Sequence, residues 1–221
     1  MNVLVIGASR GLGLEFVRQY REAGDAVTAS ARDDAGLERL RGLGATPVRL
    51  DVADAASASG LAWQIDGARF DVAIVNAGVS GQRVAPLAPP AEENFDAVMH
   101  ANVLGPMRVI AQIAAALAPA ARLALLSSRM GSIGGRTSAS SWLYRASKAA
   151  VNSILKDAAL TLGDRVACVA LHPGWVRTDM GGAGADIDAA TSVAGMRRVI
   201  AGLRPADSGA FFDYAGKTIP W

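Results

Sequence analysis

Short apolar runs alternate with longer helix-like stretches along this chain. The runs hold mostly valine, leucine and alanine, and they occupy residues 3–6, 26–31, 47–50, 72–76, 122–127 and 166–172. Between them, amphipathic or alanine-rich stretches cover residues 12–21, 37–43, 56–65, 92–117 and 144–162. Apolar strands that alternate with helices are typical of a parallel sheet covered on both faces. The pattern therefore predicts an α/β fold.

The same pattern predicts one domain over residues 1–221. A seventh strand is expected near residues 211–213 or 217–219, and neither an internal repeat nor a low-complexity linker interrupts the alternation. The proline-rich stretch 86–90 is interpreted as a loop before a helix. We therefore expect a single doubly wound, Rossmann-type domain with a parallel sheet of about seven strands and helices on both faces.

Composition narrows the class of protein. Hydrophobic residues make up 51% of the 221 positions and charged residues 19%, which is typical of a globular chain. The formal net charge is +2 and the basic residues are scattered, so we expect no nucleic-acid partner. No run approaches the roughly 18–20 apolar residues of a membrane span, and the first residues do not resemble a signal peptide. A cytoplasmic protein without membrane association is expected.

Neither a disulfide nor a metal site is expected. Cys168 is the only cysteine and lies in an apolar run, so it is interpreted as a buried, inert thiol. His100 and His172 have no cluster of cysteines or carboxylates around them in the sequence, so we predict no metal ligation.

A glycine-rich loop directly follows the first predicted strand and opens the first predicted helix. Glycines permit a tight turn and close approach of a pyrophosphate, while the helix N-terminus supplies free N–H groups and positive potential. The spacing is G-x-x-x-G-x-G instead of the commoner G-x-G-x-x-G, and an ordinary glycine-rich turn is the alternative. The loop residues expected to contact a dinucleotide are Gly7, Ser9, Arg10, Gly11, Leu12 and Gly13.

Charge after the second predicted strand bears on which dinucleotide binds. A carboxylate there would favour NAD by accepting hydrogen bonds from the ribose, whereas arginine binds a 2′-phosphate well. Arg32 follows the strand, and Arg10 lies inside the glycine loop. Asp33 and Asp34 come next, and a shift of one residue would place an acid at the ribose. We predict NADP(H) in preference to NAD(H).

Two further strand ends carry residues suited to a nucleotide. Asp51 and Val52 follow the third predicted strand, where the aspartate is expected to meet the adenine amino group. Asn76, Ala77 and Gly78 mark the end of the fourth, where a small backbone suits close packing against a cofactor. Plain turn chemistry is the alternative for both segments.

Tyr144 and Lys148 lie four residues apart in a predicted helix, so their side chains share one face. The chain has only three tyrosines and three lysines, which makes chance a weak explanation for the pair. A free phenol has a pKa of about 10, and a neighbouring cation favours its ionised form. We therefore predict that Lys148 lowers the pKa of Tyr144 and so fits it for general acid–base chemistry.

Together these motifs resemble the short-chain dehydrogenase/reductase superfamily, in family order and over essentially the whole chain. The segments around residues 127–133 and 144–148 and the ending 212–221 further resemble its C-factor-like and sniffer-like carbonyl reductases. The resemblance implies an enzyme that transfers hydride between a nicotinamide and a carbonyl or alcohol carbon. Besides the glycine loop, the matching elements are Asn76-Ala-Gly78, Asn102, Ser128, Tyr144, Lys148 and His172-Pro-Gly174.

The resemblance also implies roles for single residues. Tyr144 would be the general acid in reduction and the base in oxidation, and Lys148 would hold the nicotinamide ribose. Ser128 would hydrogen-bond the substrate oxygen, and Asn102 would support a water-linked proton relay to Lys148. The segment expected to flank the nicotinamide amide contributes Pro173, Gly174, Val176 and Thr178.

The choice of serine depends on alignment, because Ser127 and Ser132 are close to Ser128. The family pattern Ser-x-x-Gly, counted back from Gly131, selects Ser128. That serine precedes Tyr144 by a few more residues than in many family members. We interpret the extra length as a loop within residues 134–141, near the mouth of the substrate site.

The substrate side is expected to be an apolar pocket for small carbonyl compounds. Its candidate residues would each suit core packing equally well. The glycine-rich segment 179–196 is interpreted either as a substrate lid or as a surface loop. Arg136 is expected to be solvated in preference to binding an anionic group. The candidates for the pocket are Met130, Trp142, Trp175 and Met180.

The leading hypothesis is an NADP(H)-dependent carbonyl reductase or alcohol dehydrogenase. The alternative is an NAD(P)-binding signalling or regulatory protein with incidental turnover, because C-factor-like proteins are associated with developmental signalling. A nucleotide-sugar epimerase would share the Tyr/Lys pair, but the short C-terminal region leaves little room for a sugar-binding domain. A homodimer or homotetramer is a further hypothesis, since the family often pairs the helices that correspond to residues 92–117 and 144–162.

Overall fold

The computed structural model describes residues 1–82, 84–85 and 87–221. Its described residues form one seven-stranded parallel sheet in the order β3-β2-β1-β4-β5-β6-β7. This arrangement confirms the predicted fold class, and the seventh strand is the first of the two predicted segments. The strands are β1 (Asn2–Ile6), β2 (Ala26–Ala31), β3 (Thr46–Arg49), β4 (Phe70–Val75), β5 (Leu117–Leu126), β6 (Val166–His172) and β7 (Ala210–Asp213).

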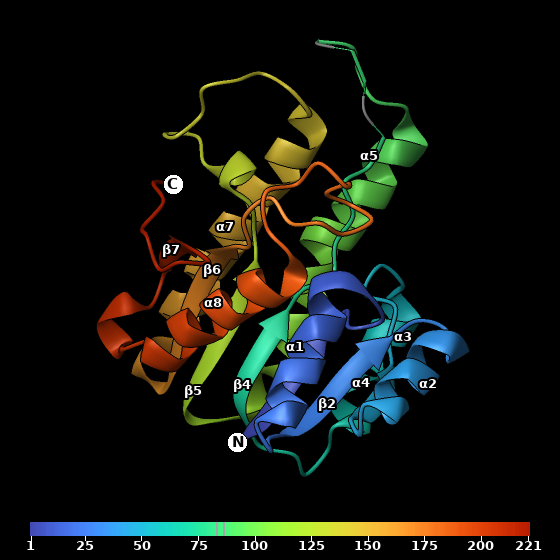
Figure 1. Cartoon of the computed structure of the whole chain (residues 1–221), viewed down its shortest axis with the longest axis vertical. Helices are drawn as coiled ribbons and strands as arrows, with labels where there is room; N and C mark the ends of the chain where they lie inside the picture. Colours follow the sequence, from blue (N-terminus) through green and yellow to red (C-terminus); the bar gives the residue numbers. More distant parts are fainter. Residues whose placement is uncertain (83, 86) are drawn as a thin grey trace.

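The strand order reverses direction between β1 and β4. After β1 the chain moves outward through β2 and β3, and it then returns to the other side of β1 at β4. Crossovers leave on opposite faces on either side of this point, so a crevice opens at the carboxyl ends of β1 and β4. Figure 1 shows the loops that follow β4, β5 and β6 gathered at that same end of the sheet.

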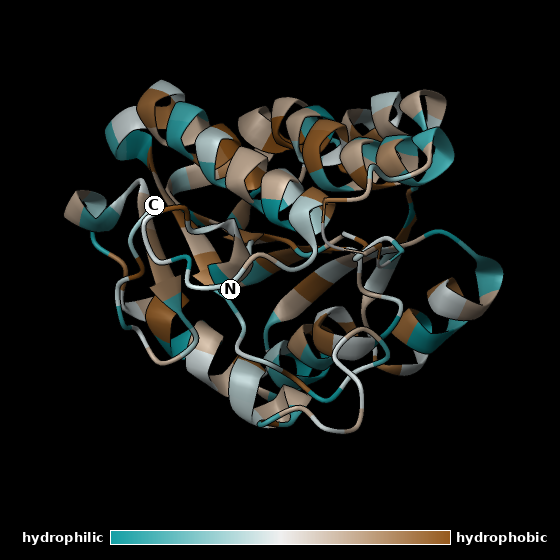
Figure 2. Cartoon of the chain, turned by 90° about the horizontal axis from the view of Figure 1, so that it is seen from above, coloured by the Kyte–Doolittle hydropathy of each residue, from teal (hydrophilic) through white to brown (hydrophobic). Residues whose placement is uncertain are grey.

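Helices cover both faces of the sheet, as predicted. One face carries α1 (Gly11–Glu22), α2 (Asp34–Gly42) and α8 (Ala189–Gly202). Figure 2 shows the largely hydrophobic strands enclosed between the two helical layers. The opposite layer contains α3 (Ala55–Ser59), α4 (Leu61–Gln64), α5 (Glu92–Met99), α6 (Gly105–Ile113) and α7 (Trp142–Leu162).

Alternation along the strands divides the core in two. Val3 and Val5 pack with the α1, α2 and α8 layer, whereas Leu4 and Ile6 pack with the other layer. All four side chains are fully buried. Successive side chains of a strand point to opposite faces, so a strand that is apolar at every position is buried on both sides.

The predicted helix over residues 92–117 is interrupted. A π-helical turn, His100–Leu104, separates α5 from α6, and a 3₁₀ turn, Ala114–Ala116, leads directly into β5. The predicted helix 56–65 is likewise divided at Gly60 into α3 and α4. In the described part of the chain, no helix has the combination of length and apolarity required to cross a bilayer.

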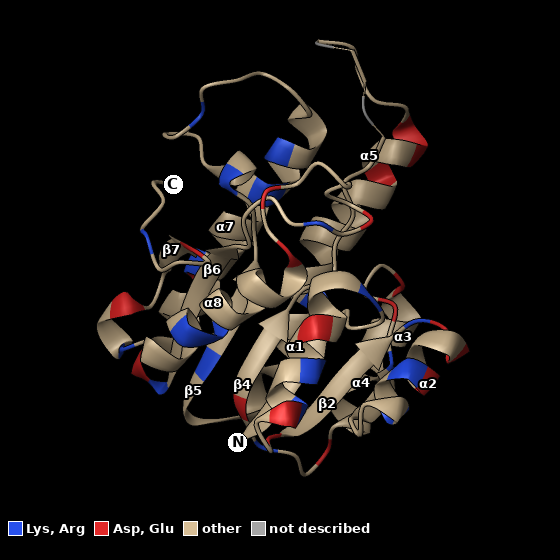
Figure 3. Ribbon diagram, in the orientation of Figure 1, with Lys and Arg blue, Asp and Glu red and all other residues tan. Residues whose placement is uncertain are grey.

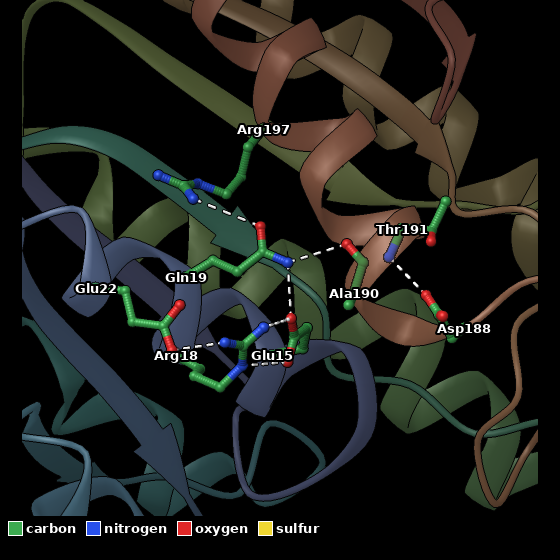
Figure 4. Close-up of polar contacts among 8 residues, drawn as sticks. All are labelled: Glu15, Arg18, Gln19, Glu22, Asp188, Ala190, Thr191 and Arg197. Atoms are coloured by element: carbon green, nitrogen blue, oxygen red, sulfur yellow. Dashed lines mark hydrogen bonds and ion pairs between the residues drawn. The ribbon is translucent and has the colours of Figure 1, made fainter.

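Helix α8 corrects part of the lid interpretation of residues 179–196. Asp188 caps this helix by accepting a hydrogen bond from the Thr191 backbone N–H at 2.7 Å. Gln19 on α1 donates to the Ala190 carbonyl at 3.0 Å (Figure 4). Val193 and Met196 are fully buried. A buried, capped helix is fixed to the sheet, so residues 189–196 belong to α8, and residues 179–188 precede it as a loop.

Candidate active site

Two positions of the glycine loop have no room for a Cβ atom, so only glycine fits there. Gly7 has φ of +82°, and a Cβ there would lie 2.7 Å from the Ala77 backbone. A Cβ on Gly13 would lie 2.1 Å from the Gly7 carbonyl oxygen, so α1 packs directly on the loop. Gly11 differs, since a Cβ there would meet nothing nearer than Thr178 at 3.6 Å across the crevice.

Two side chains from neighbouring strands fix the first glycine. The Gly7 N–H donates to the Ser30 hydroxyl at 2.9 Å, and the Asn76 amide donates to the Gly7 carbonyl at 2.6 Å. The N-terminus of α1 follows, and no side chain caps it. This loop with free helix N–H groups fits a pyrophosphate.

The arginines at the nucleotide end contact carboxylates across the crevice. Arg10 forms an exposed ion pair with Asp179 at 2.9 Å, and Arg32 lies 4.0 Å from Asp51. Both arginines line the nucleotide crevice.

Asp33 and Asp34, the two acids that complicate the prediction of NADP(H), interact with groups outside the crevice. Asp33 accepts a hydrogen bond from the Gly36 backbone N–H at 2.7 Å and so caps α2. Asp34 pairs with Arg49. Neither acid lines the crevice, so the positive groups face it without these two carboxylates.

Sequence reasoning missed Ser30 and Arg39 at this end. The Arg39 guanidinium reaches from α2 and donates to the Ser9 carbonyl at 3.0 Å. Ser30 holds Gly7 through the hydrogen bond described above. Both contacts join residues more than twenty positions apart, and no local spacing signals them.

A crevice of about 240 Å³ runs from the glycine loop to α7. Most residues predicted to contact a dinucleotide line it. Gly13 does not, because it lies beneath the loop, and Gly174 and Val176 line the adjoining cavity instead. The predicted residues in the crevice are Gly7, Ser9, Arg10, Gly11, Leu12, Arg32, Asp51, Val52, Asn76, Ala77, Gly78, Tyr144, Lys148, Pro173 and Thr178.

Helix α7 brings Tyr144 and Lys148 together, with the Lys148 ammonium 5.8 Å from the centre of the tyrosine ring. Burial raises the pKa of Tyr144, and a hydrogen bond with Ser128 opposes that rise in part. The prediction of a lowered tyrosine pKa is therefore wrong for the protein without a ligand. Desolvation disfavours the phenolate more than its neighbours favour it.

Lys148 is 5% exposed, and its ammonium donates to the Leu126 carbonyl at 2.8 Å. Within the part of the chain that the structure describes, no carboxylate lies within 4.0 Å of this ammonium. Burial without a counter-charge lowers the pKa of Lys148 to about 8.

Hydrogen bonds distinguish the three candidate serines. The Ser127 hydroxyl donates to the Asn152 side-chain oxygen at 2.5 Å, and the Ser132 hydroxyl donates to the Pro220 carbonyl. Ser128 accepts from the Met130 backbone N–H at 3.1 Å and is hydrogen-bonded to Tyr144. Of the three, Ser128 is therefore the one whose hydroxyl meets the phenol.

Asn102 lies in the π-helical turn and is completely buried. Its side-chain amide donates to the Val79 carbonyl at 2.8 Å and to the Ser147 hydroxyl at 3.0 Å. Its oxygen accepts from the Val79 N–H at 2.7 Å. The side chain therefore ties the loop after β4 to α7, and it lines neither cavity.

A second cavity of about 560 Å³ adjoins the crevice at Tyr144. Hydrogen bonds within residues 175–187 hold the segment beside this cavity together. The Arg177 backbone N–H donates to the Ile187 carbonyl at 2.8 Å, and the Trp175 indole N–H donates to the Gly181 carbonyl at 2.8 Å. Residues 179–188 thus form a compact loop. The predicted pocket residues Met130, Trp142, Trp175 and Met180 all line the cavity, as does Ser128.

Two other predicted features can be placed. Cys168 is fully buried, which fits an inert thiol. His172 lines the larger cavity, and burial lowers its pKa to about 4. No group of three or more potential metal ligands occurs among the described residues.

Comparisons with known proteins agree with this geometry. A family model described as short chain dehydrogenase matches residues 1–186. The C-signal protein of Myxococcus xanthus is 44% identical over 154 residues, which are 68% of this chain and 92% of that protein. A putative short-chain dehydrogenase/reductase from Burkholderia multivorans, solved with bound NADP, superposes with a TM-score of 0.91 at 31% identity. The carbonyl reductase Sniffer of D. melanogaster gives a TM-score of 0.91 at 28% identity, and both alignments cover 100% of this chain and 99% of the other.

Proposed function

This chain belongs to the short-chain dehydrogenase family, and we propose that it is an NADP(H)-dependent carbonyl reductase or alcohol dehydrogenase. One observation carries the proposal. Tyr144 faces both cavities, with Lys148 beside it in the nucleotide crevice and Ser128 beside it in the substrate cavity. A group that moves a proton during hydride transfer must lie between cofactor and substrate in this way.

The side chains supply the proton chemistry of reduction. Tyr144 donates its proton to the substrate oxygen while the Ser128 hydroxyl hydrogen-bonds the same oxygen. The raised pKa of Tyr144 keeps the phenol protonated at neutral pH, as an acid requires. Lys148, with a pKa of about 8, returns a proton to the phenolate. The buried side chain of Asn102 ties the loop after β4 to α7 and so helps to position the helix that carries Lys148. Bound NADPH supplies the hydride.

The choice of NADP(H) rests on two arginines of the crevice. Arg10 and Arg32 line it, whereas Asp33 caps a helix and Asp34 pairs with Arg49. The Burkholderia multivorans relative was solved with NADP bound. A 2′-phosphate would take over Arg10 from its exposed pair with Asp179, because such exposed pairs contribute less than about 1 kcal/mol.

The predicted roles on the substrate side follow from the same arrangement. Residues 179–188 act as a compact flap over the cavity, and Thr178 with the backbone at Val176 flanks the nicotinamide. The apolar side chains that receive the body of the substrate are Met130, Trp142, Trp175 and Met180.

The test is turnover of aldehydes and ketones by the purified protein, with NADPH and NADH compared. We expect faster turnover with NADPH, and Tyr144→Phe should lower kcat by at least about a hundredfold while the Kd for NADPH changes little. Tyr20→Phe is the matched control, because Tyr20 lies on α1 outside both cavities. Retained turnover in Tyr144→Phe would reject the assigned acid, and a preference for NADH would reject the role of the arginines.

A second candidate function is that of an NAD(P)-binding signalling or regulatory protein with incidental turnover. The 44% identity to the C-signal of Myxococcus xanthus favours it. Binding of NADPH with no reduction of any carbonyl compound in the same screen would support this alternative over the enzyme.

A further inference from the structure

Arginines, and no carboxylate, are found among the described residues that line the larger cavity. Among the described residues around it are Arg129, Arg136 and Arg145, but neither aspartate nor glutamate. The chain as a whole is nearly balanced, with 22 basic and 20 acidic residues, so this positive lining is a local feature. Figure 3 shows basic positions without acidic ones on the loop between β5 and α7. Residues of this loop line one side of the cavity.

Arg145 is a buried cation that has only neutral partners. It is 7% exposed, and its guanidinium donates to the Ser140 carbonyl at 2.6 Å and to the Ser138 hydroxyl at 2.7 Å. A longer hydrogen bond of 3.5 Å reaches the Met130 carbonyl. No carboxylate lies within 4.0 Å of it in the described chain. A buried charge normally has a counter-charge, and the described residues provide none for Arg145.

Two more arginines that line the cavity, Arg129 and Arg136, are exposed and have few polar partners. Arg136 is exposed, and it has no ion pair among residues that the structure describes. It is close enough to help lower the pKa of Arg145. Arg129 is 63% exposed and lies 3.9 Å from Asp213, which already accepts hydrogen bonds from two backbone N–H groups.

Large apolar side chains lie at the rim beside these arginines. Trp142, Trp175 and Met180 are 39%, 54% and 52% exposed where they line the cavity. Large apolar side chains at the surface, next to unpaired cations, suit a ligand with an apolar body and an anionic end.

We propose that the substrate is a carbonyl compound, or the corresponding alcohol, that carries a carboxylate on an apolar body, and that Arg136 and Arg145 receive this carboxylate. The inference rests on the proposed function, which places the reacting oxygen at Tyr144 and Ser128. In reduction the carbonyl carbon gains a hydride from NADPH and the oxygen gains a proton from Tyr144. The carboxylate is unchanged and serves to bind and orient the substrate.

The test compares acids with their methyl esters as substrates. We would measure kcat/KM with NADPH for 4-formylbenzoate and methyl 4-formylbenzoate, and for 3-benzoylpropionate and its methyl ester. The acids should be preferred by about tenfold, which is the scale of one charge-assisted hydrogen bond. The preference should fall toward unity in Arg136→Gln and in high salt, and Arg136→Lys should keep part of it.

Arg69→Gln is the matched control. It removes one positive charge next to the amino end of β4, away from both cavities, so the preference for acids should persist. Esters reduced as well as the acids, or a preference unaffected by Arg136→Gln, would overturn the inference and leave the proposed function standing.

If neither acid nor ester were reduced, the proposed function would fail and binding would still decide the anion site. Calorimetry with 4-hydroxymethylbenzoate and its methyl ester, in the presence of NADP, supplies that measurement. Tighter binding of the acid that is lost in Arg136→Gln supports the site, and equal binding of acid and ester overturns it.

Discussion

Replacing Lys148 with methionine is expected to make the protein without a ligand more stable. The ammonium is 5% exposed, has one carbonyl partner and has no carboxylate within 4.0 Å in the described chain. Methionine has a similar length and no charge, so it fills the same space without the cost of burying an ion.

The magnitude follows from the pKa of the lysine. Burial lowers this pKa from 10.5 to about 8. Each unit corresponds to about 1.4 kcal/mol, so the charged form costs about 3 kcal/mol at neutral pH. Methionine leaves the Leu126 carbonyl without its donor, which costs about 1 kcal/mol. The net expectation for Lys148→Met is a gain of about 2 kcal/mol in the free energy of unfolding at pH 7.

The effect has a defined pH window. Below pH 8 the lysine is charged in both the folded and the unfolded chain, so the full cost is present. Between pH 8 and 10.5 the unfolded chain binds more protons than the folded one, so wild-type stability rises with pH relative to the variant. The advantage of Lys148→Met should therefore shrink across this interval.

Urea unfolding of the protein without cofactor, measured between pH 7 and about pH 9.5, tests this reasoning. Lys156→Met is the matched control, because Lys156 is exposed on the same helix and its replacement should change stability by less than about 0.5 kcal/mol. The same Lys148→Met protein should lose reductase activity. A less stable Lys148→Met, or an advantage that is constant with pH, would show that the ammonium is not held at a cost.

Two further perturbations have expected outcomes. Gly13→Ala should lower Tm and weaken NADPH binding, because the new Cβ would lie 2.1 Å from the Gly7 carbonyl oxygen. The control Gly42→Ala should be tolerated, because a Cβ there has no atom within 4 Å. Equal Tm values for the two variants would contradict this packing. His172→Asn should make the stability of the protein less sensitive to acid. Burial lowers the pKa of His172 from 6.5 to about 4 in the folded protein. The wild type therefore loses up to about 3 kcal/mol of its free energy of unfolding as the pH falls from 6.5 to 4, and the variant does not. Urea unfolding at pH 4 to 7 measures the difference, and parallel curves for both proteins would refute it.

The sheet was predictable because its central strands β1, β4 and β6 are apolar at nearly every position. A strand that is buried on both faces does not alternate between apolar and polar residues. The continuous apolar run that results is typical of a parallel sheet covered on both faces. The interruption at His100–Leu104 was not predictable in this way. It depends on the buried contacts of Asn102 with Val79 and Ser147, which are distant in sequence.

Helix α8 was missed although its signals were present. Asp188 precedes a stretch in which Val193, Met196 and Ile200 follow helical spacing. The glycines before it suggested a loop, and Gly195 within it reads as a helix breaker. In the structure that glycine is required, since a Cβ would lie 2.3 Å from the Tyr214 carbonyl. The close packing of α8 against the chain after β7 therefore explains why a glycine occurs within this helix.

Local motifs located the candidate site, but they did not determine its electrostatics. Spacing of four places Tyr144 and Lys148 on one face of α7, and that holds in the structure. The sign of the tyrosine pKa shift depends on burial by residues from other elements, which no motif contains. The positive wall around Arg145 is similarly assembled from the loop after β5, through Ser138 and Ser140.

Desolvation acts on the two central groups in opposite directions, and this gives the pair its chemistry. It raises the pKa of Tyr144, so the phenol keeps its proton at neutral pH, and it lowers the pKa of Lys148 to about 8, so the ammonium releases a proton more readily. After the phenol has given its proton to a substrate oxygen, the phenolate and the ammonium would be opposite charges in a dry site. Proton return from Lys148 to Tyr144 removes both charges at once, so burial itself drives the proton back to the tyrosine.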